Sequence, residues 1–260
     1  RDLHLSIRRQ RQMCIRDRCE TSTKVFVLEV MGRHAGWIAA AGALAQEHNG
    51  DAPHIILLPE VAFNKKAFLA KVNETVCSKG FCVVVVSEGA RFANGKFLGE
   101  SGAAKDAFGH AQLGGVAPFV ANMIKESLGY KYHWAVADYL QRAARHIASA
   151  TDVEQAYAVG KAAVEFALHG KNAVMPAIIR GKGKKYSWRI GEAKLSDVAN
   201  VEKKMPRDYI SKDGFHITEK ARNYFTPLVK GEDYPPYKNG LPQYAKLKNI
   251  LAKKKLKPWT

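Results

Sequence analysis

A junction near the N-terminus combines the residue types that can hold a phosphate group. Residues 27–37 read VLEVMGRHAGW, so that an apolar β-rich run passes through Gly32 into helix-forming residues. A helix start presents backbone N–H groups without partners, a glycine lets a ligand approach the backbone, and Arg33 can contact phosphate through two N–H groups. The letters also describe an ordinary strand-to-helix turn with a surface arginine, so both interpretations stay open.

An acid and a cationic turn follow two later strand-like runs. Glu88 comes directly after the apolar run 83–86, at the end of a strand where open α/β sheets bind ligands. After the run 131–137, Tyr139 can donate a hydrogen bond and Arg142 brings a positive charge. Without further evidence, Glu88 could equally be a surface or helix-capping carboxylate. The turn with Tyr139 and Arg142 could equally be the end of a strand, with the tyrosine in the core.

Alternating strand and helix patterns must position these residues. The continuous β-branched run in residues 81–87 (FCVVVVS) is typical of a strand buried on both faces. The alternation predicts an α/β fold with a parallel sheet covered on both sides. Strands are expected at residues 24–31, 54–59, 81–87, 131–137 and 173–180, and helices at residues 36–48, 64–78, 115–128, 151–168 and 217–229, with caps at Asn64, Thr151 and Thr218.

Composition limits the class of protein. The 260 residues carry a net charge of +17, which favours anionic partners, but residues 1–20 and 246–257 hold much of the excess and predict solvated basic ends. No apolar run approaches the roughly 20 residues that span a bilayer, so no membrane association is expected. The four cysteines form no CxxC pair and indicate a reduced, cytoplasmic location without a metal centre.

Several motifs in a fixed order give the chain a resemblance to a known family. The sequence MGRHAGW, followed by SEGA at 87–90 and YLQR at 139–142, resembles the phosphofructokinase family. The residues of these motifs are most similar to those of its pyrophosphate-dependent members. The resemblance covers about residues 22–250 and implies a three-layer, Rossmann-like parallel sheet of the phosphofructokinase type. Further matching segments are LLPE (57–60), DAFGHAQLGG (106–115), AARHIAS (143–149), NVEKKMP (200–206) and GEDYPPY (231–237).

The resemblance implies an activity and a role in it for several residues. It implies transfer of a phosphoryl group from pyrophosphate to the 1-hydroxyl of fructose 6-phosphate, giving fructose 1,6-bisphosphate in glycolysis with Mg²⁺. Met31, Gly32 and Arg33 would contact the sugar phosphate and the transferred phosphate, with Arg33 stabilising charge in the transition state. Glu88 would accept hydrogen bonds from sugar hydroxyls.

Other matched positions would bind the 6-phosphate of the sugar. Tyr139, Gln141 and Arg142 match the segment for this role, with Tyr139 where nucleotide-using relatives have His. Lys24 and His133 stand where many members place arginines that reach the phosphate across a subunit interface, which implies a homodimer or higher oligomer. Lysine keeps the charge without the fork, and histidine is only partly charged near neutral pH.

Two family segments have no match in this sequence. The Gly-Gly-Asp donor loop and the Thr-Ile-Asp-x-Asp segment, which carries the catalytic Asp base, are absent, so the first half and its Mg²⁺ ligands are expected to be missing. We expect a disordered, non-family lead-in at 1–22, a fructose-6-phosphate-binding α/β domain at 23–142, and a returning segment at 143–260 that completes the sheet, packs on the missing half and ends in a basic tail. Such a fragment would be inactive alone and poorly soluble.

Three alternative functions stay open at this point. An ATP-dependent 6-phosphofructokinase would share the sugar site, because the residues that select the donor belong to the segments without a match. A non-catalytic, sugar-phosphate-sensing subunit would keep the site without the chemistry. A basic nucleic-acid-binding protein would explain the charge, but no nucleic-acid-binding motif supports it, so nucleic acid is not an expected partner.

Overall fold

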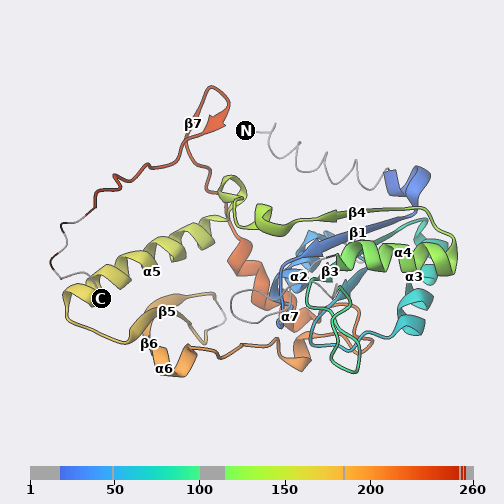
Figure 1. The fold of residues 1–260 in the computed structure, drawn as a ribbon, viewed down its shortest axis with the longest axis horizontal. Helices are drawn as coiled ribbons and strands as arrows, with labels where there is room; N and C mark the ends of the chain where they lie inside the picture. Colours follow the sequence, from blue (N-terminus) through green and yellow to red (C-terminus); the bar gives the residue numbers. More distant parts are fainter. Residues whose placement is uncertain are drawn as a thin grey trace.

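A four-stranded parallel sheet forms the centre of the structure, a computed structural model that describes residues 18–48, 50–99, 115–183, 185–251, 253 and 255. The strand order is β2-β3-β1-β4 (Figure 1). The strands are β1 (Val25–Val30), β2 (Ile55–Leu57), β3 (Cys82–Ser87) and β4 (Tyr132–Val136).

The register places the ends of three strands at one side of the sheet. Val25 at the start of β1 pairs with Cys82 on β3 and with Tyr132 on β4. Because all pairs are parallel, β3, β1 and β4 also end together, near Ser87, Val30 and Val136. We call this side the carboxyl edge and the opposite side the amino edge.

Helices α3 (Lys65–Lys79) and α4 (Val116–Leu128) cover one face of the sheet. The core between them contains fully buried side chains such as Phe68 on α3 and Val84 on β3. Asn64 caps α3 as the sequence predicts, because its side chain accepts a hydrogen bond from the Ala67 N–H at 3.0 Å.

The other face is covered from both ends of the chain. Helix α2 (Trp37–Ala41), extended by the 3₁₀ turn η2 (Gly42–Ala45), packs there beside α7 (Glu219–Phe225). The expected helix at 36–48 is therefore shorter than predicted. Its Trp37 ring meets the aromatic rings of Tyr209, Tyr224 and Phe225 with centroids 5.7–6.2 Å apart. The two faces complete the expected three-layer α/β/α arrangement.

A second unit stands away from the central sheet (Figure 1). Helix α5 (Ala150–Leu168) packs on a two-stranded antiparallel sheet of β5 (Val174–Arg180) and β6 (Trp188–Lys194). The cap of α5 is Ser149, whose hydroxyl accepts a hydrogen bond from Asp152 N–H, and not the predicted Thr151. The remaining short elements are η1 (Cys19–Thr23), η3 (Asp138–Gln141), η4 (Arg145–Ile147), α6 (Leu195–Val198), η5 (Arg207–Tyr209), η6 (Thr226–Val229), β7 (Tyr237–Lys238) and β8 (Leu241–Pro242).

One face of α5 is apolar and uncovered. Tyr157, Val164 and Leu168, which the sequence places on one helical face, are 75%, 61% and 80% exposed. The opposite face is the one that packs on the hairpin, where Ala162 is buried. This arrangement gives α5 an apolar surface open to solvent, of the kind expected to reduce solubility.

Two features differ from the expected organisation. Within the described ranges no strand after residue 142 joins the central sheet, since β5 and β6 pair only with each other, and residues 205–225 pack on the α2 face. The end of the 1–22 lead-in is ordered, because Cys19–Thr23 forms a π-helical turn with Cys19 buried. The boundaries at 22 and 142 remain predictions. Across the described part of the chain, no helix has the length and apolarity to cross a bilayer.

Candidate functional site

The carboxyl edge brings together the segments that follow β1, β3 and β4. The loop after β3 is held to the loop after β1 by backbone hydrogen bonds, from Glu88 N–H to Val30 C=O at 2.9 Å and from Gly89 N–H to Gly32 C=O at 3.2 Å. The sequence separates the two loops by more than 50 residues, but parallel pairing of β1 and β3 makes them neighbours.

The Glu88 carboxylate is fixed by the backbone of Gly32. Gly32 N–H donates to Glu88 Oε1 at 3.0 Å, and the Ser87 hydroxyl donates to Gly32 C=O at 2.6 Å. Gly32 has φ +145°, and a β-carbon there would lie 2.8 Å from both Ala35 O and Ser87 Oγ. Glycine is therefore required at this position, and Glu88 is oriented before any ligand arrives.

Arg33 follows in the same tight contact. A β-carbon on Gly89 would lie 1.8 Å from the Arg33 carbonyl oxygen, so the two loops lie backbone to backbone. Met31, Gly32 and Arg33 are all half-buried at the carboxyl edge. The structure thus brings four of the predicted site residues, these three and Glu88, into one loop pair.

At the start of α2, the N–H group of Gly36 already has an acceptor within the chain. Gly36 N–H, at the N-cap, donates to both carboxylate oxygens of Glu60, at 3.0 and 3.2 Å. Met205 N–H donates to the same carboxylate at 3.0 Å. The prediction of a free N–H group is wrong at Gly36, because the chain's own acid occupies the helix start and ties it to residue 205.

The turn after β4 holds the predicted phosphate contacts. Tyr139 and Gln141 lie in η3, which begins directly after β4 at the carboxyl edge, and Arg142 follows it. The Arg142 guanidinium lies 5.4 Å from the centroid of the Tyr139 ring, and Tyr139 is 67% exposed. Gln141 Nε2 donates to Asp138 C=O at 3.1 Å. The side chains of Tyr139 and Arg142 are both exposed, and their phosphate-binding role stays a prediction.

Lys24 and His133 lie at the amino edge instead. Lys24 precedes β1, and its ammonium group donates to Glu20 C=O at 2.8 Å. His133 pairs with Phe26, the second residue of β1, and is exposed. Seven steps along the chain, through the six residues of β1, lead from Lys24 to Met31, which amounts to about 23 Å. The nine predicted residues therefore form two groups at opposite edges of one sheet.

Sequence reasoning missed a buried acid at the carboxyl edge. Glu29 on β1 is 2% exposed, and its carboxylate accepts a hydrogen bond from Ala117 N–H at 2.8 Å at the start of α4. Burial raises the pKa of Glu29, and the nearby charges of Glu88 and Asp138 raise it further. The signal was present, because a charged residue interrupts the apolar strand pattern VLEV.

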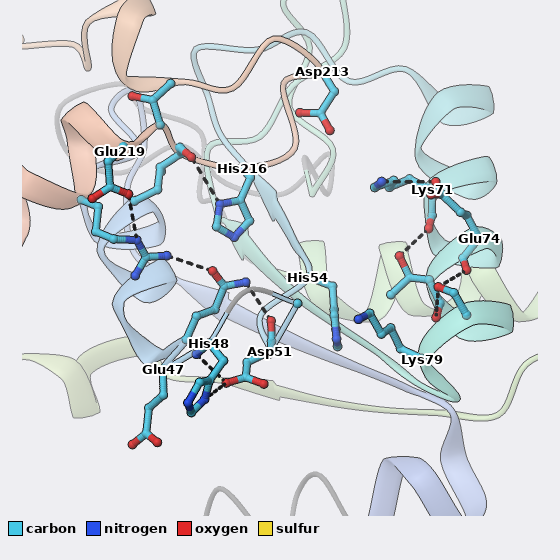
Figure 2. Close-up of a pocket in the computed structure, with 17 residues that line it drawn as sticks. Glu47, His48, Asp51, His54, Lys71, Glu74, Lys79, Asp213, His216 and Glu219 are labelled. Carbon is cyan, nitrogen blue, oxygen red and sulfur yellow. Dashed lines mark hydrogen bonds and ion pairs between the residues drawn. The ribbon is translucent and has the colours of Figure 1, made fainter.

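A cavity of about 700 Å³ lies away from this edge and is lined by none of the predicted site residues (Figure 2). In it, His54 Nδ1 accepts a hydrogen bond from Val83 N–H at 3.0 Å, and Lys79 lies beside the ring. Burial, followed by the charge of Lys79, lowers the pKa of His54 to about 4. The Nε2 atoms of His54 and His216 are buried without a partner. His54 Nε2 carries its proton, because Nδ1 accepts, so it cannot ligate a metal.

Metal binding finds no support in the part of the chain that the structure describes. Those residues contain no cluster of three or more His, Cys, Asp or Glu side chains that could hold a metal ion.

A comparison with protein families decides the family. A phosphofructokinase model matches residues 8–167. The chain belongs to the phosphofructokinase family. The match begins inside the segment 1–22 that the sequence sets apart, and it includes every predicted site residue.

Individual members of the family are closely similar. The chain is 63% identical over 238 residues to a pyrophosphate--fructose 6-phosphate 1-phosphotransferase of Halomonas elongata, covering 92% of this chain and 57% of the relative. For the Methylococcus capsulatus protein of the same name, the identity is 62% over 248 residues, with 95% and 59% covered. The chain thus spans less than three fifths of the length of these relatives.

Solved structures of family members have the same fold. The crystal structure of a pyrophosphate-dependent phosphofructokinase from Marinobacter aquaeolei matches with a TM-score of 0.82 at 58% identity, over 95% of this chain and 58% of that chain. The corresponding protein from Nitrosospira multiformis matches with a TM-score of 0.83 at 56% identity, over 96% and 59%. The expected phosphofructokinase-type fold is confirmed.

Proposed function

We propose that this chain forms the sugar-phosphate side of an enzyme that transfers a phosphoryl group from pyrophosphate to the 1-hydroxyl of fructose 6-phosphate. The observation that carries the proposal is the carboxyl edge, where the carboxylate of Glu88 is locked onto Gly32 beside Arg33. The names of the similar proteins support pyrophosphate over ATP as the donor.

In this proposal each side chain has a role that its position supports. A carboxylate has about four acceptor positions, so Glu88 can accept sugar hydroxyls while it holds Gly32 N–H. Arg33 supplies a permanent positive charge where negative charge grows on the transferred group. Arg142 and Tyr139, exposed on the neighbouring turn, bind the 6-phosphate by charge and by a hydroxyl hydrogen bond.

A coupled assay on the complete gene product that contains these residues tests the activity. We expect formation of fructose 1,6-bisphosphate with pyrophosphate and none with ATP as the sole donor. Turnover with ATP alone would contradict the choice of donor, and failure to consume fructose 6-phosphate with either donor would contradict the activity itself.

We propose that the reaction requires Mg²⁺ without assigning it to this chain. Loss of activity with a chelator and recovery with added Mg²⁺ would support the requirement. Retention of full activity in chelator would contradict it.

We further propose that Lys24 and His133 serve the sugar-phosphate site of a neighbouring subunit. Both lie at the amino edge, roughly 20 Å or more along β1 from the chain's own Gly32, too far to share one phosphate with Arg142. In a homodimer whose sites each take Lys24 from one subunit and Arg142 from the other, the Lys24→Ala and Arg142→Ala variants each have low activity. A mixed dimer of the two variants contains one intact site.

Refolding equal amounts of the two weak variants together tests this arrangement. Random mixing should restore about a quarter of the wild-type activity if each site takes one residue from each subunit. Activity no higher than that of the separate variants would contradict the shared site. As a control for losses during refolding, wild-type protein is denatured and refolded in the same way.

A further inference from the structure

The buried acid Glu29 connects the three segments of the sugar-phosphate site. It is the one charged side chain that is buried among the described residues. It lies on the central strand β1, level with Val86 on β3 and Val136 on β4, one or two residues before the loops that carry Glu88 and Tyr139.

The side chain of Glu29 supplies a cap that α4 lacks. The N-cap of α4 is Gly115, which has no side chain and makes no capping hydrogen bond. Glu29 Oε2 accepts from Ala117 N–H at 2.8 Å, so a carboxylate from the sheet satisfies the first turn of the helix and favours its dipole. The contact fixes the start of α4 against β1.

The backbone of the same residue fixes the turn after β4. Glu29 C=O accepts a hydrogen bond from Ala137 N–H at 3.0 Å, directly before η3 with Tyr139 and Gln141. Glu88, on the other side, is close enough for its charge to act on the Glu29 carboxyl group. Glu29 therefore touches or borders each segment of the site, and its own side chain is buried.

We propose that Glu29 is a positioning residue of the sugar-phosphate site, whose buried carboxyl group fixes α4 against β1 and, because α4 also packs on β4, keeps Glu88 and the Tyr139 turn facing one substrate. This inference rests on the proposed function. A residue of this kind acts on the affinity for the sugar phosphate through geometry, because small displacements of positioned groups strongly weaken substrate orientation.

Three variants of the complete enzyme separate positioning from general stability. Glu29→Ala should raise KM for fructose 6-phosphate at least about tenfold and leave KM for pyrophosphate unchanged. Glu29→Gln should recover most of this loss, because its amide oxygen can still accept the Ala117 N–H. Val27→Ala, equally buried on the same face of β1, is the matched control and should lower stability without a selective change in KM.

Equal changes in KM for Glu29→Ala and Val27→Ala would overturn the proposal. Amide hydrogen exchange on the same proteins decides the matter without substrate, even if the wild-type enzyme does not use fructose 6-phosphate. In Glu29→Ala, the amide exchange rates should rise at Ala117 and at residues 137–142 and stay unchanged in β3. Val27→Ala should not show this pattern. Unaltered protection at both segments would also overturn the proposal. If Glu29→Ala fails to fold, the Glu29→Gln variant decides: the proposal is overturned if Glu29→Gln does not show wild-type KM and wild-type protection.

Discussion

Gly89 lies against the carbonyl group of Arg33, where an added β-carbon would stand 1.8 Å from the carbonyl oxygen. Gly89→Ala must push the two loops apart at the carboxyl edge. We expect a loss of about 3 kcal/mol in the free energy of unfolding, measured by urea denaturation, and loss of sugar-phosphate affinity.

Gly160→Ala is the control, because a β-carbon on this residue of α5 meets nothing within 4 Å. It should raise stability by about 0.5–1 kcal/mol through helix propensity. A Gly89→Ala protein as stable as wild type would show that the loop pair adapts.

Arg142 should set the affinity for the 6-phosphate. We expect Arg142→Ala in the complete enzyme to raise KM for fructose 6-phosphate by roughly 10- to 100-fold, the effect of losing one charged hydrogen bond. Arg142→Lys should fall between, since lysine lacks the planar fork. Steady-state kinetics measure both, with the exposed Arg189→Ala on β6 as the control. An unchanged KM in Arg142→Ala would remove this residue from the site.

Glu60 should stabilise the junction between α2 and the returning chain. Glu60→Ala leaves the N–H groups of Gly36 and Met205 without their acceptor, and we expect a loss of about 2 kcal/mol in stability. Glu60→Gln should recover part of it. Thermal unfolding followed by fluorescence measures the change, with Glu126→Ala, exposed on α4, expected within about 0.5 kcal/mol of wild type. Equal stability of all four proteins would contradict the junction.

His54 should make the protein less stable in mild acid. Its native pKa is lowered from 6.5 to about 4, so between these values the unfolded chain binds a proton that the native chain does not. Stability from this group is complete above about pH 6.5 and is lost as the pH falls toward 4. Because the ring is partly exposed, we expect a loss of about 1–2 kcal/mol.

Urea denaturation at pH 7 and pH 4.5 measures this loss. His54→Asn should lose less stability than wild type between these two values, because the titrating ring is gone. His48→Asn, an exposed histidine of the same cavity, should follow wild type. Parallel pH profiles for wild type and His54→Asn would show that the ring titrates normally.

The uncovered face of α5 should limit solubility. Leu168→Lys removes an 80% exposed leucine from this face, so the chain should remain monodisperse at higher concentration with stability unchanged within about 0.5 kcal/mol. Light scattering against concentration measures the effect. Ala162→Lys, buried on the opposite face, should instead destabilise the protein. Equal aggregation of Leu168→Lys and wild type would assign poor solubility to another surface.

Local patterns in the sequence were sufficient for the central sheet. The strands around Val25, Ile55 and Cys82 are short runs rich in apolar, β-branched residues, and the side chain of Asn64 caps α3 by a hydrogen bond three residues away, so both signals lie within a few residues. The hairpin strand β6 escaped prediction because charged residues interrupt WRIGEAK and it pairs only with one exposed strand.

The site was only partly predictable because its decisive contacts join distant residues. Glu60 reaches Gly36 across 24 positions and Met205 across 145, and no local pattern indicates either partner. The separation of Lys24 from Gly32 was predictable, since one strand lies between them. The resemblance implies that Lys24 reaches a phosphate across a subunit interface, and that role stays a prediction.

The packing of residues 205–225 on the α2 face has a consequence for synthesis of the chain. Ile56 and Val85 lie in a core whose other wall includes Met205 and Phe225. As the protein emerges from the ribosome at roughly 5–20 residues per second, this wall follows β3 by roughly 6–28 s. During that interval α2 and η2 cover this face of the nascent sheet without their later partners, so part of its apolar surface stays open to solvent and to chaperones that bind such surfaces.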